Sequence, residues 1–324
     1  MTGSLHQVEV HRQIVPAKQE DQRTVLTIGA YDGVHKGHRS VISEVCRLAN
    51  EQDLRSAVVT FDRHPASVVR PESAPLLLTE LDQKLEQLTT TGIDLTLVVP
   101  FDESRAKETA EEFIEEVLVN CLKVKYVVVG EDFHFGHQRL GNVALLQEAG
   151  KKYDFTVIGM DLVGLNGEPA RDHKQVSSTF IRQALGEGDL KKANDMLGRD
   201  YEVAGVVTAG DGRGKELGFP TANIRISSSI LLPADGVYAG WLELSDESNY
   251  PTAISLGTRP HFYKDGALLL EAHVLDFDRD LYGEKVRVRF TEHIRPQKKF
   301  DSLEALVVQL NTDVLTTKQI MTSR

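Results

Sequence analysis

The sequence predicts an α/β protein, with a doubly wound parallel sheet followed by a small antiparallel β-barrel and a C-terminal helix. Two observations predict this class. Up to about residue 160, short β-branched runs alternate with helical patterns, as expected of right-handed crossovers in a parallel sheet. Beyond about residue 200, short alternating runs follow one another with turn residues between them, which is typical of an antiparallel barrel. At 324 residues the chain also has room for two domains with separate cores.

The first half is predicted to alternate strands with amphipathic helices. The expected strands are Val25–Ile28, Ser56–Phe61, Leu95–Val99, Lys125–Val129 and Phe155–Met160. The expected helices are Val41–Leu48, Glu80–Thr91 introduced by Thr79, Thr109–Cys121 and Val143–Lys152. Thr109 followed by Glu112 is a capping-box signature. In such a sheet we expect the functional site at the carboxyl ends of the strands.

A change of rhythm after Ser177 marks the second half. Residues Ser177–Arg199 predict one or two helices broken at Gly186 and Gly188, and we place the domain boundary there, giving domains 1–185 and 186–324. The expected strands are Tyr201–Thr208, Gly236–Leu244, Thr252–Leu256, Leu268–Asp276 and Lys285–Phe290. A last helix, Leu303–Leu310, is expected after a cap at Asp301.

Composition excludes several classes of protein. A net charge of −11 argues against a general nucleic-acid binder, because the phosphate backbone attracts basic surfaces. The two cysteines, Cys46 and Cys121, provide no disulfide framework or metal cluster and suit a reducing compartment. No apolar run reaches the length of about 18 residues expected of a membrane span, and no signal-peptide pattern opens the sequence. We therefore expect a soluble, cytoplasmic protein.

The turn after the first strand is the first candidate site. It carries His35, Gly37 and His38 between a buried strand and a helix, where free helix-start N–H groups attract anions. Imidazole N–H groups can bind phosphate oxygens and offset the charge that develops at phosphorus. A histidine pair of this spacing can also be incidental, or half of a zinc site.

A second candidate phosphate-binding element combines hydroxyl groups with a helix start and a guanidinium. Ser177, Ser178 and Thr179 precede a helix that carries Arg182, although such a run is also a common helix cap. Together GAYDGVHKGH and SSTFIR resemble the H-x-G-H and S-S-T-x-I-R signatures of the nucleotidylyltransferase superfamily. That resemblance implies adenylyl or cytidylyl transfer with a Rossmann-like fold, His35, His38 and Arg182 catalytic, and Gly29, Asp32, Gly37, Ser177, Ser178 and Thr179 at the nucleotide.

Two further stretches bear on which molecule accepts the transferred nucleotidyl group. Phe133 and Phe135 could form a stacking wall for a planar ligand, although phenylalanines near a strand end more often pack in the core. TFDRHP and GEDFHFGHQRLGN resemble stretches of prokaryotic FAD synthetases, which implies FMN as acceptor and flavin contacts from Asp62, His64, Asp132, Phe133 and Phe135. The sequence departs from that family's usual residues at Ala30, Tyr31, His134 and Phe180.

A glycine-rich loop followed by an extended segment marks the second candidate site. Backbone N–H groups of GDGRGKELGFPTANI, here Gly210, Gly212, Arg213, Gly214 and Lys215, could approach the phosphates of ATP. Thr221 and Asn223 are two residues apart, so along a strand they share a face and present neutral oxygens that suit magnesium. The alternative is a plain hairpin loop beside an ordinary edge strand.

This run is similar to the signature of riboflavin kinases, and LLPADGVYAG, SLGTRP, LLEAHVLDFDRDLYG and RPQKKFDSLEAL continue the resemblance. It implies that Glu271 is the catalytic base, where an isolated strand glutamate would otherwise face solvent. It also implies flavin contacts from Arg295 and Phe300. Ser255 stands where that family carries asparagine.

Taken together, the chain resembles the bifunctional riboflavin kinases and FAD synthetases of bacteria from about Thr24 to about Asp313. The resemblance implies Mg²⁺, ATP, riboflavin, FMN and FAD as cofactor, substrates or products, and small-molecule partners rather than nucleic acid or membrane. We expect a monomer or a weak homo-oligomer. Two alternatives stay open: a flavin-binding or regulatory paralogue with one inactive site, and a kinase joined to a nucleotidyltransferase with another acceptor.

Overall fold

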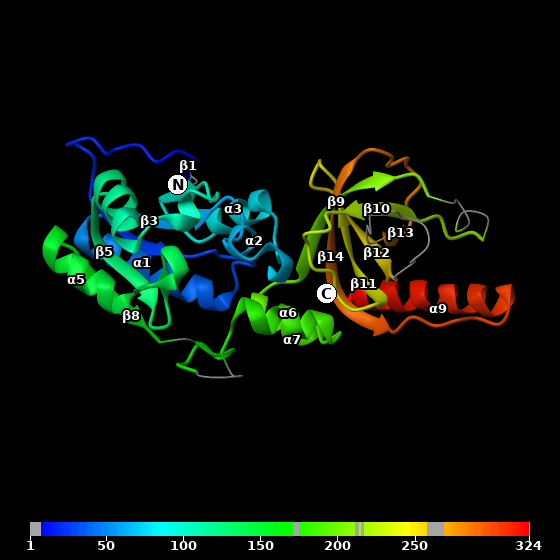
Figure 1. Cartoon of the computed structure of the whole chain (residues 1–324). Helices are drawn as coiled ribbons and strands as arrows, with labels where there is room; N and C mark the ends of the chain where they lie inside the picture. Colours follow the sequence, from blue (N-terminus) through cyan, green and yellow to red (C-terminus); the bar gives the residue numbers. More distant parts are fainter. Residues whose placement is uncertain are drawn as a thin grey trace. The chain divides into compact units, whose positions relative to one another are not determined.

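The computed structural model describes residues 8–161, 163–170, 175–210, 214, 217–257 and 269–323. The chain forms two compact units, Met1–Ser177 and Ser178–Arg324, and each is considered by itself (Figure 1). The expected division after residue 185 lies eight residues further along than this one. The helix Ser178–Gly186 (α6) packs against Leu190–Leu197 (α7) and therefore belongs to the second unit.

The first unit is built on a six-stranded sheet in the order β1-β4-β3-β2-β5-β8, and every neighbouring pair is parallel. The strands are β1 (Glu9–His11), β2 (Thr24–Ile28), β3 (Arg55–Phe61), β4 (Leu95–Val99), β5 (Val124–Gly130) and β8 (Thr156–Met160). This confirms the predicted doubly wound parallel sheet. The edge strand β1 was not predicted, because its three residues are all exposed and too few to form a recognisable strand pattern.

Helices cover both faces of this sheet (Figure 1). Leu26 and Ile28 point to the face covered by α4 (Ala110–Phe113), the following turn of π-helix (Ile114–Cys121) and α5 (Val143–Tyr153). Val25, one residue away, points to the face covered by α1 (Lys36–Gln52) and α3 (Leu81–Thr89). Because both faces are buried, the central strands are continuous apolar runs, as parallel sheets require.

The details of two helices differ from their predictions. Thr109 and Glu112 do form the predicted capping box, with Glu112 N–H donating to Thr109 Oγ1 over 3.2 Å. The helix after Thr109 changes to π-helix from Ile114, a local change of hydrogen bonding that residue type does not signal. Helix α3 is capped by Glu80 and not by Thr79, whose hydroxyl binds elsewhere.

The second unit is a closed antiparallel barrel, as predicted, in the order β10-β13-β12-β11-β14-β9. Its strands are β9 (Tyr201–Thr208), β10 (Ala222–Ile226), β11 (Gly236–Glu243), β12 (Asn249–Leu256), β13 (Leu269–Val274) and β14 (Lys285–Arg295). The C-terminal helix α9 runs from Leu303 to Thr322, two and a half times the predicted length, and its cap is Ser302 rather than Asp301. Gly212, Arg213 and Lys215 lie outside the described residues, as does Leu268 at the start of one predicted strand.

Candidate active sites

The first site lies where the direction of strand order reverses. From β2 the chain adds β3 and β4 on one side, and later β5 and β8 on the other, so the end of β2 is the topological switch point. The turn that leaves β2 carries His35 and His38, with α1 beginning at Lys36. The predicted histidine turn therefore stands at the position where open α/β sheets bind their ligands.

His35 and His38 form one stacked pair. Their ring centroids are 3.5 Å apart with an interplanar angle of 17°. His35 is the N-cap of α1, and its Nδ1 accepts a hydrogen bond from the backbone N–H of His38 over 3.3 Å. An accepting Nδ1 carries no proton, and charges on both rings would repel each other, so the pair holds at most one imidazolium.

Tyr31 and Gly37 pack around this pair. The Tyr31 ring lies 4.8 Å from the His38 ring, its hydroxyl contacts Thr27 Oγ1 at 2.7 Å, and its burial raises its pKa. Tyr31 has a φ of 52°, a left-handed conformation that costs energy for a bulky residue. A Cβ at Gly37 would lie 3.1 Å from the carbonyl oxygen of Val176 and 3.2 Å from the His35 ring, so only glycine fits without movement.

The same contact places part of the second predicted phosphate element. The carbonyl oxygen of Val176 lies against Gly37. Ser177, the residue after Val176, therefore lies near the histidine turn, and both belong to the first unit. Ser178, Thr179 and Arg182 belong to α6 in the second unit. Their role at the nucleotide stays a prediction.

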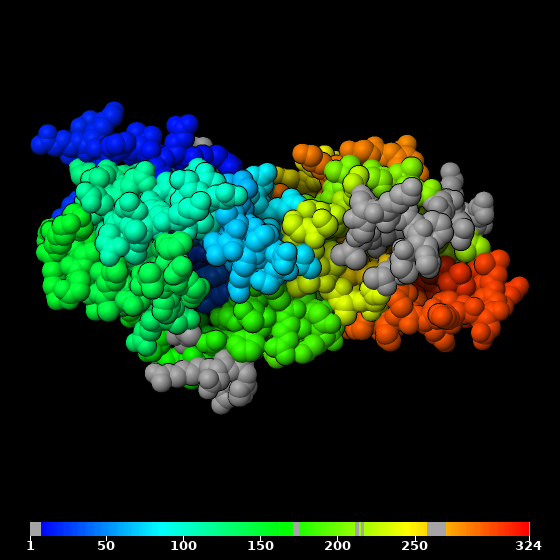
Figure 2. All heavy atoms as spheres, in the orientation of Figure 1, coloured from blue at the N-terminus to red at the C-terminus, as the bar shows by residue number. Residues whose placement is uncertain are grey.

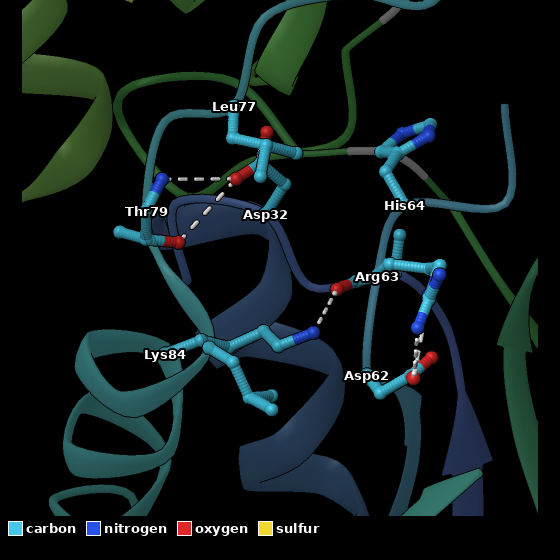
Figure 3. Close-up of a pocket in the computed structure, with 9 residues that line it drawn as sticks. Asp32, Asp62, Arg63, His64, Leu77, Thr79 and Lys84 are labelled. Atoms are coloured by element: carbon cyan, nitrogen blue, oxygen red, sulfur yellow. Dashed lines mark hydrogen bonds and ion pairs between the residues drawn. The ribbon is translucent and has the colours of Figure 1, made fainter. Parts of the chain in front are cut away.

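A pocket opens beside the turn, at the carboxyl ends of β2 and β3 (Figure 3). Its walls include the predicted residues Asp32, Asp62 and His64. The pocket is also lined by Ala30, Arg63, Leu77, Thr79, Leu81 and Lys84. Sequence reasoning missed Lys84 because it lies mid-helix with no motif around it.

Two predicted phosphate contacts are engaged with the protein itself. Asp32 is 5% exposed, and its carboxylate accepts the backbone N–H groups of Leu78 and Thr79 over 3.0 and 3.1 Å. The N–H of Gly29 donates to Val59 O over 3.0 Å. Asp62 Oδ1 likewise accepts the backbone N–H of Phe101 over 2.9 Å. These contacts shape the turn and the pocket.

Of the two phenylalanines that were predicted to stack against a ligand, one lies in the core and the other is half-buried. The rings of Phe133 and Phe135 are stacked, with centroids 5.4 Å apart. Phe135 is buried and also meets Phe113 at 5.9 Å, so it packs in the core, whereas Phe133 is half-buried above it. Asp132 is exposed, and its carbonyl oxygen contacts His134 Nδ1 at 2.8 Å.

In the second unit, strand register assembles the other site. Glu271 on β13 stands directly opposite Asn223 on β10 and opposite Ser255 on β12. Side chains opposite each other in antiparallel strands share a face. The neighbours Ile224, Leu270, Ala272, Ile254 and Leu256 point into the buried barrel interior. Asn223, Glu271 and Ser255 therefore form a polar row on the outer face.

Two described glycines of the loop, Gly210 and Gly214, lie against the residues at one end of this row. A Cβ at Gly210 would overlap the side-chain amide of Asn223, and a Cβ at Gly214 would lie 2.4 Å from the carbonyl oxygen of Phe219 and 3.3 Å from Thr221 Oγ1. Each glycine therefore allows the loop backbone to approach one predicted magnesium ligand. This explains why the glycine loop and the Thr221–Asn223 segment are consecutive in sequence.

His273 is a residue of this site that sequence reasoning missed. It lies two residues after Glu271 on β13 and so shares its face. Its Nδ1 contacts the carbonyl oxygen of Pro220 at 2.7 Å, and its ring meets Phe219 edge-on at 5.7 Å. Because a carbonyl oxygen only accepts, Nδ1 carries the proton, and this bond fixes the backbone immediately before Thr221.

At the other end, the loop after β14 is attached to the barrel and to α9. Gln297 Nε2 donates to Ser255 Oγ over 3.0 Å and to Leu256 O over 2.7 Å. Arg295 makes a bidentate pair with Asp313 on α9, with Nε–Oδ1 and Nη2–Oδ2 distances of 2.9 and 2.7 Å. Phe300 lies 6.0 Å from the Arg295 guanidinium. Arg295 was predicted to contact flavin, and the structure shows that it fixes this loop.

We expect Asp313→Asn to destabilise the barrel by about 3 kcal/mol, the scale for breaking a buried ion pair. The side chains of Arg295 and Asp313 are only 17% and 4% exposed, so the variant leaves a poorly hydrated guanidinium without its partner charge. Urea unfolding followed by fluorescence measures this directly, because the single tryptophan, Trp241, lies in barrel strand β11. The control Lys318→Gln removes an exposed pair on the same helix and should leave the midpoint nearly unchanged. Equal midpoints for both variants would contradict this account.

The fold and the two candidate sites together define a class of protein. A stacked histidine pair at the switch point of a doubly wound sheet suits nucleotidyl transfer, and a glycine loop over neutral oxygens beside a carboxylate suits phosphoryl transfer. The chain is thus a two-site transferase acting on phosphates. Family models agree: FAD synthetase matches residues 17–180, and riboflavin kinase matches residues 197–321.

The curated relatives cover nearly the whole chain. A bifunctional riboflavin kinase/FMN adenylyltransferase of Haemophilus influenzae is 38% identical over 93% of this chain and 96% of its own. Its namesake in Listeria monocytogenes is 34% identical over 94% and 95%. The Escherichia coli K12 protein of the same name is 37% identical over 91% and 92%. The chain therefore belongs to the family of bifunctional riboflavin kinases/FMN adenylyltransferases.

A solved structure shares this fold. It is titled a macrolide-efflux protein from Streptococcus pneumoniae, and it is 29% identical with a TM-score of 0.82 over 96% of this chain and 99% of its own. That title names a different activity from the curated relatives. Among the described residues, none of the helices combines the length and apolar character needed to cross a membrane.

Proposed function

We propose that the second unit phosphorylates riboflavin to FMN and that the first unit joins FMN to AMP from a second ATP, giving FAD and pyrophosphate. Membership of the family supports both activities. The observation that carries the kinase assignment is the row in which Asn223, Glu271 and Ser255 face the same side of the barrel. The corresponding observation in the first unit is the stacked His35–His38 pair at the switch point.

In the kinase reaction, Glu271 accepts the proton of the terminal ribityl hydroxyl as that oxygen attacks the γ-phosphorus of ATP. The new O–P bond forms while the bond to the β-phosphate oxygen breaks, and ADP leaves. The glycine loop holds the phosphates through backbone N–H groups. His273 maintains the segment that carries Thr221 and Asn223 through its bond to Pro220 O. The loop fixed by Arg295 and Gln297, with Phe300, forms the flavin side.

Magnesium fits Thr221 and Asn223, which are the residues that would hold it. Both offer neutral oxygens, and Gly210 and Gly214 let the loop backbone lie close to both side chains. When bound, the ion would neutralise phosphate charge. Among the residues that the structure describes, no group of three or more histidine, cysteine or acidic side chains is arranged to hold a metal. The ion would therefore complete its coordination with nucleotide phosphates and water.

In the first unit, a phosphate oxygen of FMN attacks the α-phosphorus of ATP, and pyrophosphate leaves. His38 and His35 stabilise the charge on the transferring phosphate, and Gly37 lets the ligand approach the turn. We assign Asp32 and Gly29 to shaping that turn, since their polar groups bind the backbone around it. Asp62, His64, Asp132 and Phe133 contact the flavin, while Phe135 supports Phe133 from the core. Ser177, Ser178, Thr179 and Arg182 bind the nucleotide.

We assign adenylyl transfer to residues 1–185 and riboflavin phosphorylation to residues 186–324, a boundary that groups α6 with the adenylyl-transfer residues although it belongs to the second compact unit. We further propose a cytoplasmic monomer or weak homo-oligomer without nucleic-acid partners. The net charge of −11 supports the last point.

The direct test incubates the protein with riboflavin, ATP and magnesium and follows FMN and FAD by chromatography. We expect FMN first and FAD later. Absence of FMN would overturn the kinase assignment. FMN without FAD would favour the alternative in which the first unit uses another acceptor, and binding without turnover at either site would favour the regulatory paralogue.

We expect Gly210→Ala to lower FMN formation at least tenfold, because the added methyl group must displace Asn223. The loss should be largest at low magnesium, and FAD formation from supplied FMN should be unchanged. Gly186→Ala is a matched control, since nothing lies within 4 Å of the added methyl group. A normal rate for Gly210→Ala at all magnesium concentrations would show that the loop does not need this close approach.

A further inference from the structure

Lys84 is a buried ammonium beside the first active site that none of the steps above uses. It lies on α3, is 7% exposed, and its side chain reaches the carboxyl ends of two strands. Its Nζ donates to Ala30 O over 3.2 Å, to Thr60 Oγ1 over 3.1 Å and to Phe61 O over 2.7 Å. Figure 3 shows the ammonium at one wall of the pocket.

The number of N–H donors on the Lys84 ammonium limits which groups it can bind. An ammonium has three N–H donors, and three protein oxygens accept them here. No donor is left for a phosphate oxygen, so Lys84 is suited to holding the protein rather than the ligand. Charging an unpaired group at this depth would be costly, and the three acceptors offset that cost.

The three acceptors belong to the two segments that carry the predicted catalytic and flavin residues. Ala30 begins the turn to His35 and His38, while Thr60 and Phe61 end β3 immediately before Asp62 and His64. Thr60 Oγ1 also donates to Ala30 O over 3.2 Å, which closes a triangle between the two strand ends.

The helix that carries Lys84 is attached to the same turn at a second point. Asp32 accepts the N–H groups of Leu78 and Thr79 just before α3, and Gly33 N–H donates to Thr79 Oγ1 over 3.1 Å. A shift of the turn after β2 would therefore break bonds at both points, and a shift of the β3 end would break the bonds to Lys84. The exposed segment just before, Pro71–Ser73 (η1), is part of the light-blue surface in Figure 2.

We propose that Lys84 is a positioning residue for adenylyl transfer, whose ammonium holds the histidine turn and the Asp62–His64 segment at the spacing that the reaction requires. This inference rests on the proposed function of the first unit. A displacement of about 1 Å in such a site costs on the order of 10²-fold in rate, which is the scale at stake.

The charge of Lys84 predicts how kcat/KM for FAD formation depends on pH. Burial lowers the pKa of this ammonium to about 8, and the facing carboxylates of Asp32 and Asp62 act in the opposite direction. Arg63 and His64 are the other charged or titratable groups that line the pocket. Below pH 8 the three donors are present. Above it one is lost, so kcat/KM for FAD formation should fall as pH rises through about 8.

The test replaces Lys84 by methionine, which has a similar length and no donor. We expect kcat for FAD formation from FMN and ATP to fall tenfold to a hundredfold with little change in KM, and the alkaline fall in kcat/KM to disappear. Lys84→Arg keeps donors and charge and should recover part of kcat. FMN formation by the second unit of the same chain should stay at the wild-type rate, which confines the loss to the first unit.

A matched control lies in the same unit. Lys123 also donates to three backbone oxygens, those of Lys18, Gln19 and Asp21, but it is half-buried, these bonds lie at the exposed surface, and it precedes β5 at the amino end of the sheet. Lys123→Met should leave kcat and its pH profile unchanged. If Lys84→Met misfolds, Thr60→Val removes one acceptor and should lower kcat in the same direction by less.

Three results would overturn the inference. The first is a Lys84→Met variant with wild-type kcat. The second is a variant whose loss of activity matches only its loss of folded protein, and the third is an alkaline fall that persists in its pH profile. A wild-type protein that makes no FAD would instead overturn the proposed function of the first unit, so the two failures are distinguishable.

Discussion

Glu271→Gln should reduce FMN formation by about 10²- to 10⁴-fold, the range expected when a general base is removed. The substitution keeps the size of the side chain and its place between Asn223 and Ser255, but it removes the carboxylate to which we assign removal of the ribityl proton. FAD formation from supplied FMN should proceed at the wild-type rate. The measurement is the initial rate of each product in separate assays with saturating ATP and magnesium.

A matched control for this variant lies across the barrel. Glu292 is an exposed glutamate on β14, which two strands separate from β13 in either direction around the barrel. Glu292→Gln should leave both rates unchanged. Equal loss of FMN and FAD formation in Glu271→Gln would contradict the assignment of the two reactions to independent sites.

His38→Ala should lower FAD formation by more than about 10²-fold, the scale for one lost transition-state donor. The substitution removes the outer ring of the stacked pair, while His35 can still cap α1 by accepting the backbone N–H of residue 38. The loss should appear in kcat more than in KM, because the charge that His38 offsets develops in the transition state. FMN formation should not change.

His11→Ala provides the comparison, since His11 is an exposed histidine on the edge strand β1. An unchanged FAD rate in His38→Ala would show that the pair is structural. A fall in both FMN and FAD formation would point to a folding defect instead, and thermal unfolding of the variant would identify it.

The departures from the family pattern have structural counterparts. Tyr31 packs against His38 and contacts Thr27 through its hydroxyl, so its ring contributes to the histidine site. Ser255 accepts a hydrogen bond from Gln297, so the shorter side chain still contacts the flavin-side loop. These contacts favour two active sites over a paralogue that only binds flavin.

The fold could be predicted from the sequence because both halves repeat strong local patterns. Strands buried on both faces are β-branched apolar runs, and barrel strands alternate, so their positions follow from residue type. Two elements without such a local pattern were not predicted. The three exposed residues of β1 form a strand by pairing with β4, and the change to π-helix after Phe113 is not signalled by residue type.

For the two sites as well, the sequence indicated some residues, and only the structure showed which of them are in contact. Residue type and spacing made His35, His38, Thr221 and Asn223 candidates for phosphate chemistry, and the resemblance to riboflavin kinases added Glu271. Only the tertiary structure decided which residues meet. Strand register aligned Glu271 with Asn223, and packing paired Arg295 with Asp313 and buried Lys84 among three oxygens. Such partners lie 18 to 54 residues apart in the chain, so no local pattern could reveal them.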